Sequence, residues 1–240
     1  MSNIRIFVSH RIDIDSETVD TPVYFPVRCG AVYDEEGNSE IQGDDTGDNI
    51  SKLRMSFCEF TVQYWAWKNV DADYYGLCHY RRYLSFSDKR YKNTVFNMVR
   101  ELKLTPHEKK KYHLDDTKKI EKTVKQYDMI IPVVAKASEM SYNRAEVKTL
   151  REMWESYNGV YFEQGIIDKM FSLIKEYSPE YYNSACEYFS GKYHRAFNCY
   201  IMKKELFVRM CEFQFPIMKR ITEITDCKTC LLYTSPSPRD

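Results

Sequence analysis

Short apolar segments, separated by longer segments with helical periodicity, constrain the fold of this chain most strongly. The apolar segments have the length and residue types of strands, and they occupy residues 3–9, 73–78, 127–134 and 197–202. Helical patterns occupy residues 51–69, 116–126, 144–157, 163–176 and 203–213. Strands that alternate with longer helices favour a layered α/β domain. We therefore expect Ile4–Val8, Tyr74–Cys78 and Met129–Ile131 to be core strands of a single sheet.

The segment 51–69 has the clearest helical pattern. Its apolar residues recur at spacings of four, three and four, at Leu53, Phe57, Phe60 and Tyr64. Residues at these spacings share one face of a helix. We therefore expect Phe57, Phe60 and Tyr64 to point into the core. Lys52 and Lys68 should face solvent.

Positive and negative charges balance along the chain. Its 35 basic and 35 acidic residues give a formal net charge of zero at pH 7, which excludes a uniformly basic nucleic-acid-binding protein as the default. The longest apolar run, residues 129–135, is strand-sized and well short of the roughly 18 residues that span a bilayer. The amino terminus alternates like a strand and has no apolar signal core, so we expect a cytoplasmic protein.

Residues 88–126 form the most basic segment, with twelve Lys or Arg against six Asp or Glu. Such a segment is compatible with peripheral contact to anionic lipid headgroups on the inner face of the cytoplasmic membrane. A solvated charged surface is the alternative.

The last eleven residues, CLLYTSPSPRD at 230–240, back-translate codon by codon into a transposase sequencing adapter read in frame. We expect this tail to be foreign, so that the native domain occupies residues 1–229 and is truncated at its carboxyl end. The Cys227-x-x-Cys230 spacing is then no native metal motif. The other cysteines lack zinc-type spacing, and we expect reduced thiols.

Several motifs together resemble one protein family. They follow one another as DDTGDNIS (44–51), FCEFTVQYWAWKN (57–69), YYGLCHYRRYL (74–84), QYDMIIP (126–132) and FNCYIMKKELF (197–207). In this order they resemble bacterial capsular and exopolysaccharide glycosyltransferases labelled domain of unknown function 4422. The chain departs from that family at residues 135–144, and it lacks the family's distal Arg/Gly/Tyr-rich element.

The resemblance implies a single GT-A-like (Rossmann-like) domain, with helices packed on a mixed, mainly parallel sheet. It also implies a hexosyltransferase-like enzyme in capsule, exopolysaccharide or O-antigen synthesis. Such an enzyme moves a sugar from a nucleotide-sugar donor to a glycan acceptor, here expected to be lipid-linked.

The HYRRY motif at 79–83 carries the strongest candidate site residues. It follows the strand at Tyr74, at the carboxyl end where open α/β sheets bind ligands. Guanidinium groups suit a departing diphosphate because they stay charged and fork onto its oxygens. We therefore expect His79, Arg81 and Arg82 to line a nucleotide-sugar pocket, with a turn at Tyr80 or Arg81 that separates the two arginines. The alternative is a strand end held by internal ion pairs.

Polar residues of the segment 44–51 form a second candidate group. Asp45, Asp48 and Asn49 suit contacts with a nucleoside, a sugar hydroxyl or Arg81. Asp48 or Asn49 can instead cap the following helix, and both alternatives stay open from the sequence.

Candidate metal ligands are Asp71 and Asp73, which form a DxD pattern of the kind that holds Mn²⁺ or Mg²⁺ in many GT-A enzymes. This pattern precedes its strand, whereas a working DxD should follow it. Asp13 and Asp15 form a similar pair. A metal-independent mechanism, with arginine and histidine replacing the cation, fits the sequence at least as well.

An acceptor hydroxyl needs a nearby base. Glu163 is the candidate, with Glu146 and Glu152 as alternatives on the expected solvated face of a helix.

Other classes of function also fit parts of the sequence. The basic segment and HYRRY suit a nucleic-acid binder, which the balanced charge opposes. The 20 tyrosines suit a non-catalytic module that binds a glycan or a protein partner. Stabilisation by a nucleotide would distinguish the transferase from this module.

Overall fold

The computed structural model describes residues 3–35, 40–91, 94–95, 98–100, 104–195 and 197–225. The chain divides into two compact units. Unit 1 comprises residues 1–133 and 197–209, and unit 2 comprises residues 134–196 and 210–240. The expected single domain over residues 1–229 stays a prediction. The expected foreign tail from Cys230 lies outside the described residues.

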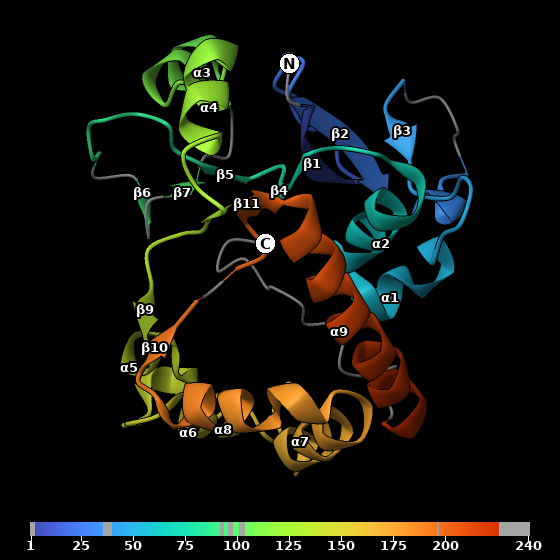
Figure 1. Cartoon of the computed structure of the whole chain (residues 1–240), viewed down its shortest axis with the longest axis vertical. Coiled ribbons are helices and arrows are strands. Elements are labelled where there is room, and N and C mark those ends of the chain that lie inside the picture. Colours follow the sequence, from blue (N-terminus) through green and yellow to red (C-terminus); the bar gives the residue numbers. More distant parts are fainter. Residues whose placement is uncertain are drawn as a thin grey trace. The chain divides into compact units, whose positions relative to one another are not determined.

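Unit 1 is built on a mixed sheet of nine strands from the described part of the chain (Figure 1). Parallel neighbours follow the order β3 (Gln42–Gly43), β2 (Tyr24–Cys29), β1 (Ile4–Arg11) and β4 (Tyr74–His79). Antiparallel strands extend the sheet from β4 in the order β5 (Arg82–Leu84), β7 (Met98–Arg100) and β6 (Thr94–Val95). β11 (Tyr200–Lys203) also pairs antiparallel with β4, and β8 (Met129–Ile130) pairs antiparallel with β11. Parallel strands are covered on both faces, which explains the almost uninterrupted burial of β1.

The three predicted strands all belong to this sheet, as β1, β4 and β8. β1 and β4 are buried as predicted, but β8 is not a core strand, because Met129 is 46% exposed. The α/β class and the mixed sheet are therefore confirmed. The strand expected over residues 127–134 is shorter than predicted, because β8 covers only Met129–Ile130. Pro132 follows closely, and proline cannot donate to a strand ladder.

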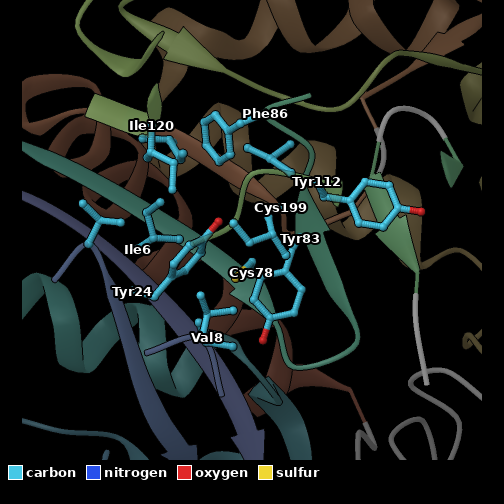
Figure 2. Close-up of a cluster of buried hydrophobic side chains, with 14 of the residues drawn as sticks. Ile6, Val8, Tyr24, Cys78, Tyr83, Phe86, Tyr112, Ile120 and Cys199 are labelled. Carbon is cyan, nitrogen blue, oxygen red and sulfur yellow. The ribbon is translucent and has the colours of Figure 1, made fainter. Parts of the chain in front are cut away.

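One face of the sheet is covered by α4 (Thr117–Val124) and by Tyr112 and Leu114, which follow α3 (Pro106–Lys111). Figure 2 shows the buried side chains that meet there, including Ile6, Val8, Tyr24, Cys78, Tyr83, Phe86, Tyr112, Ile120 and Cys199. Ile120 and Val124 are four residues apart and fully buried, so α4 rests on the sheet through one apolar face.

The opposite face is covered by α2 (Phe60–Asn69) and by the first turns of α9 (Lys204–Ile224). Phe7 of β1 lies 6.3 Å from Trp65 of α2 and 6.2 Å from Tyr75 of β4, measured between ring centroids. Tyr75 in turn stacks on Phe207 of α9 at 4.3 Å. Aromatic packing therefore fixes both helices on this face.

The helix predicted over residues 51–69 is broken. It consists of a 3-10 turn (Ser51–Leu53), α1 (Arg54–Phe57) and α2, and the break lies at Cys58 with φ 45° and ψ −130°. Residues other than glycine rarely adopt a positive φ. The break changes the helical phase, so the prediction for Phe60 is wrong: its side chain is only half-buried.

The remaining predictions for this segment are confirmed. Phe57 and Tyr64 are buried, at 1% and 8% exposure. Lys52 and Lys68 are exposed.

Unit 2 is helical with one short two-stranded sheet. Its elements are β9 (Ala135–Lys136), α5 (Ala137–Met140), α6 (Leu150–Glu155), α7 (Ile166–Tyr177), α8 (Tyr182–Ser190), β10 (Tyr193–His194) and the later turns of α9. Leu150 and Met153 form one small core. Leu173, Ile174 and Ile217 form another.

Two helix boundaries in unit 2 differ from the prediction. α6 begins at Leu150 rather than near residue 144, because the Thr149 side chain caps its first turn. α9 continues to Ile224 despite Pro216, because its later apolar residues pack against α7. Among the described helices, none is long and apolar enough to cross a membrane.

We expect Phe57→Ala to lower the free energy of unfolding by about 3–5 kcal/mol, as large-to-small changes in a packed core do. Phe60→Ala should cost clearly less, because Phe60 is only half-buried. Urea denaturation of both variants measures the difference. Equal losses would show that the break at Cys58 does not separate the two positions.

Candidate active site

The parallel strands of unit 1 all end at the same edge of the sheet, which we call the carboxyl edge. It is formed by the ends of β1, β2, β3 and β4, at Arg11, Cys29, Gly43 and His79. In open α/β sheets, ligands bind outside the carboxyl ends of parallel strands. The carboxyl edge is therefore the expected location of a ligand-binding site.

The chain reverses direction directly after β4. β5 runs antiparallel to β4, and His79 is paired with Arg82, so Tyr80 and Arg81 form the turn. The predicted turn at Tyr80 or Arg81 is confirmed. It separates the two guanidinium groups: Arg81 lies 5.1 Å from the Tyr80 ring centroid, and Arg82 lies 5.0 Å from that of Phe197. Stacking on an aromatic ring holds a guanidinium flat and leaves its edge for hydrogen bonds.

His79 is a neutral histidine at physiological pH. Burial, with the nearby charges of Arg82 and Arg81, lowers the pKa of His79 from 6.5 to about 3. Its Nδ1 accepts a hydrogen bond from the backbone N–H of Arg81 at 3.3 Å. A neutral imidazole has one donor and one acceptor nitrogen, so this bond leaves Nε2 as the donor.

Sequence inspection missed the cations contributed by β1 and α1. Arg11 donates two hydrogen bonds to Asp13, and Arg54 lies 3.2 Å from the same carboxylate. The hydrogen bond from Arg11 is the main cause that lowers the pKa of Asp13 to about 2. Arg11 also acts electrostatically on His79. The ends of β1 and β4 therefore belong to one electrostatic cluster.

Strand alternation places part of this cluster on the face covered by α2. Arg11 follows Phe7 by four residues in β1, and His79 follows Tyr75 by four residues in β4. Residues at even spacing in a strand share one face, and Phe7 lies against Trp65 of α2. Arg11 and His79 therefore lie on the α2 side of the carboxyl edge.

Asp44 is the buried centre of the predicted acidic segment. It is fully buried, and its carboxylate accepts hydrogen bonds from the backbone N–H groups of Gly30 and Ala31, both at 2.9 Å. The hydroxyls of Ser51, at 2.5 Å, and of Thr61 complete the set. Because every donor is directed at this one carboxylate, Asp44 is structural, and the sequence analysis did not identify it.

The predicted residues Asp45, Asp48 and Asn49 lie on the turn after β3. Asp45 and Asp48 are exposed, and the Asp48 carboxylate accepts a hydrogen bond from the Tyr64 hydroxyl at 3.3 Å. Asn49 donates to the backbone carbonyl of Asp45 at 3.0 Å and accepts from the Ser51 N–H at 3.2 Å. Asn49 thus binds the first N–H of the 3-10 turn at Ser51–Leu53, but the residue at the cap position of that turn is Ile50. Within the described residues neither aspartate forms an ion pair with Arg81.

A further carboxylate, Glu59, lies where α1 and α2 are broken apart. Asn198 donates a hydrogen bond to its Oε1 at 3.0 Å. Asn198 lies two residues before β11, which runs antiparallel to β4 with Tyr200 opposite Leu77. This register directs Asn198 toward the carboxyl end of β4, so Glu59 lies on the α2 side of the carboxyl edge.

The DxD pattern lies at the other end of β4. Asp73 accepts a hydrogen bond from the Asn3 backbone N–H at 2.7 Å, and Asp71 forms an ion pair with Lys204. Both contacts hold the start of β4 in place. In the part of the chain that the structure describes, no three His, Cys, Asp or Glu side chains gather in a metal-binding arrangement.

The predicted base Glu163 belongs to unit 2. Its side chain is exposed and forms an ion pair with Lys169 at 2.6 Å. Its alternatives are Glu152, which accepts a hydrogen bond from the Lys148 N–H at 2.6 Å, and Glu146, which is exposed. The catalytic role of Glu163 stays a prediction.

We expect Asp44→Ala to lower the free energy of unfolding by at least about 3 kcal/mol, because it leaves several buried donors without an acceptor. Asp48→Ala, on the exposed turn of the same segment, should cost less than about 1 kcal/mol. Thermal and urea denaturation of the two variants provide the measurement. Comparable stabilities would contradict the structural role of Asp44.

The stability of the protein should decrease as the pH falls from about 6.5 to about 4. Burial lowers the pKa of His10 from 6.5 to about 4, and His79 behaves likewise. The unfolded chain then binds protons that the folded chain does not, so acid favours unfolding in this window. Urea denaturation at several pH values should give a shallower pH dependence for His10→Gln. Identical slopes would contradict the burial of a neutral His10.

Comparison with known proteins places this geometry in context. No curated protein matches the chain. Among solved structures, the apo structure of WbbM, a bifunctional glycosyltransferase, matches with a TM-score of 0.80 and 24% sequence identity. The match covers 95% of this chain and 40% of that chain, so this chain spans less than half of that protein. At this identity, the likeness is one of fold.

The family comparison covers almost the whole sequence. The model described as "Domain of unknown function (DUF4422)" matches residues 5–235. The match runs into the segment from Cys230, whose adapter origin stays a prediction. It includes all the predicted site residues, from Asp45 to Glu163. The chain is therefore a member of the DUF4422 family.

Proposed function

We propose that this chain is a GT-A-like glycosyltransferase domain that takes a sugar from a nucleotide-sugar donor at the carboxyl edge of its sheet. The observation that carries the proposal is the gathering of positive charge at that edge: β1 contributes Arg11, α1 contributes Arg54, and the β4–β5 turn and β5 contribute Arg81 and Arg82. Family membership and the fold shared with WbbM support the same conclusion.

The cations of the carboxyl edge suit a departing nucleoside diphosphate. Arg81 forms no ion pair with a carboxylate among the described residues, and its guanidinium lies beside the turn. Arg11 and Arg54 both form ion pairs with the carboxylate of Asp13, so two further guanidinium groups lie at this edge. Preorganised cations stabilise developing negative charge without reorganisation in the transition state. We assign Arg81 to the diphosphate and His79 Nε2–H to a phosphate or sugar oxygen.

The turn after β3 is assigned to the nucleoside or the donor sugar. The exposed carboxylates of Asp45 and Asp48 can accept hydrogen bonds from ribose or sugar hydroxyls. Asn49 shapes this turn through its own hydrogen bonds.

The acceptor is proposed to be a lipid-linked glycan in the synthesis of capsule, exopolysaccharide or O-antigen. The basic segment 88–126 would then contact anionic headgroups at the membrane surface. Removing added Mn²⁺ or Mg²⁺ with a chelator decides whether a divalent cation assists the arginines.

A glycan-binding module without catalysis is the second candidate. A cluster of aromatic rings in unit 2 favours it, at Tyr142, Trp154, Tyr157, Tyr161 and Phe162. Such a module would be stabilised by glycan fragments and not by nucleotides.

We expect Arg81→Lys to lower donor turnover by about 10²–10³-fold, as the loss of one transition-state donor does, while the melting temperature stays unchanged. Arg82→Lys should lower the melting temperature, because Arg82 packs on Phe197. Release of nucleoside diphosphate from a panel of nucleotide sugars measures turnover. Arg220→Lys, on an exposed helix of unit 2, is the matched control.

Two results would contradict this assignment. If no nucleotide raises the melting temperature of the wild type, with or without manganese, the chain does not bind a nucleotide-sugar donor. If Arg81→Lys keeps full turnover, the guanidinium does not contact the diphosphate.

A further inference from the structure

The carboxylates near the carboxyl edge differ in how completely they are already bound. Asp13 is held by two guanidinium groups, and Asp34 forms an ion pair with Arg28. Asp44 accepts hydrogen bonds from two backbone N–H groups and two hydroxyls. Each of these carboxylates is occupied by contacts within the protein. None of them is available to take a proton from a ligand.

Glu59 is different. It is half-buried, and the described residues place no cation in an ion pair with it. Its Oε1 accepts the hydrogen bond from the side-chain amide of Asn198, and no protein donor within the described chain binds Oε2. One carboxylate oxygen is thus held in position while the other can accept a proton.

The backbone places Glu59 at this position. The strained Cys58 ends α1, and Glu59 directly precedes the first turn of α2. The Cys58 carbonyl accepts hydrogen bonds from the Cys29 thiol at 3.1 Å and from the Thr61 N–H at 3.0 Å. Cys29 is the last residue of β2, so this hydrogen bond connects the helix break at Cys58 directly to the carboxyl edge. Because the backbone at Cys58 is held in this way, the position of the adjacent residue Glu59 is also fixed.

A chain of contacts and neighbours connects Glu59 to the β4–β5 turn, which carries Arg81. Its partner Asn198 directly follows Phe197, whose ring lies under the Arg82 guanidinium. Arg82 is paired with His79 across the β4–β5 turn. A carboxylate and a group of cations at one edge of the sheet meet the two requirements of a sugar transfer, since the acceptor loses a proton and the diphosphate gains negative charge.

We propose that Glu59 is the general base of the transfer, an inference that rests on the proposed function. Its Oε2 takes the proton from the acceptor hydroxyl. The acceptor oxygen forms a bond to the anomeric carbon while the bond from that carbon to the phosphate oxygen breaks. The electron pair leaves with the nucleoside diphosphate, whose charge is met by Arg81. A single displacement of this kind inverts the anomeric configuration.

Glu59→Gln tests the proposal, because it keeps the oxygen that accepts from Asn198 and removes the base. The assay uses the complete chain, the nucleotide sugar that most raises its melting temperature, and water as the acceptor. Release of nucleoside diphosphate should fall by about 10²–10⁴-fold, the usual range for a general base. The melting temperature and its shift by the nucleotide should stay unchanged.

Glu121→Gln is the matched control, because Glu121 lies on α4 and its ion pair within the described residues is with Lys125. It should keep wild-type turnover. In the wild-type reaction, NMR of the released sugar should show the inverted anomer before mutarotation.

The outcomes separate this inference from the proposed function. A wild type that binds no nucleotide and releases no diphosphate overturns both. An active wild type whose Glu59→Gln variant keeps turnover within threefold overturns Glu59 alone, as does a retained anomeric configuration. Loss of turnover in Glu163→Gln together with an active Glu59→Gln variant would assign the base to Glu163 instead.

Discussion

The carboxyl edge of the sheet depends on the buried carboxylate of Asp44. A carboxylate that is buried away from solvent is stable only when hydrogen-bond donors of the protein replace the water molecules that it has lost. Its donors come from separate segments: Gly30 and Ala31 after β2, Ser51 before α1, and Thr61 in α2. These segments must therefore converge on one point. Convergence holds Gly30 in the left-handed region at φ 72°, where a Cβ would collide with the Arg54 side chain. One hydrogen-bonded carboxylate thus positions a cation of the candidate site.

The same convergence accounts for the broken helix between α1 and α2. The strained backbone of Cys58 costs about 1–3 kcal/mol in such cases, and it persists because Cys29 and Thr61 donate to its carbonyl. An unbroken helix would avoid this strain, but it would change the direction in which Glu59 and Arg54 point. Strain that is maintained by surrounding hydrogen bonds is characteristic of functional sites. The break is therefore the link between the packing of unit 1 and its proposed chemistry.

The net charge of the whole chain does not reflect the local charge at the candidate site. The formal net charge is zero, yet the cations of β1, α1, the β4–β5 turn and β5 gather at one edge. Burial and these same cations keep His79 neutral, with a pKa of about 3. A neutral imidazole donor beside arginines suits binding of a phosphate oxygen without accepting its proton. Unit 2 has a different character, because its aromatic rings pack mainly on one another.

The sequence by itself determined the features that depend on neighbours along the chain. Strand alternation predicted β1 and β4, and the cationic motif directly after an apolar strand predicted His79 and Arg81 at the carboxyl edge. Tertiary structure decided the rest. Arg54 meets Asp13 across 41 residues, and Asn198 meets Glu59 across 139, so no local spacing reveals either contact. The phase of residues 51–69 was likewise unpredictable, because the thiol that secures the break at Cys58 belongs to β2. The periodicity of apolar residues in the sequence indicates which side chains are buried. The positions of buried hydrogen-bond donors, in contrast, are determined only when segments that are distant in the sequence pack together.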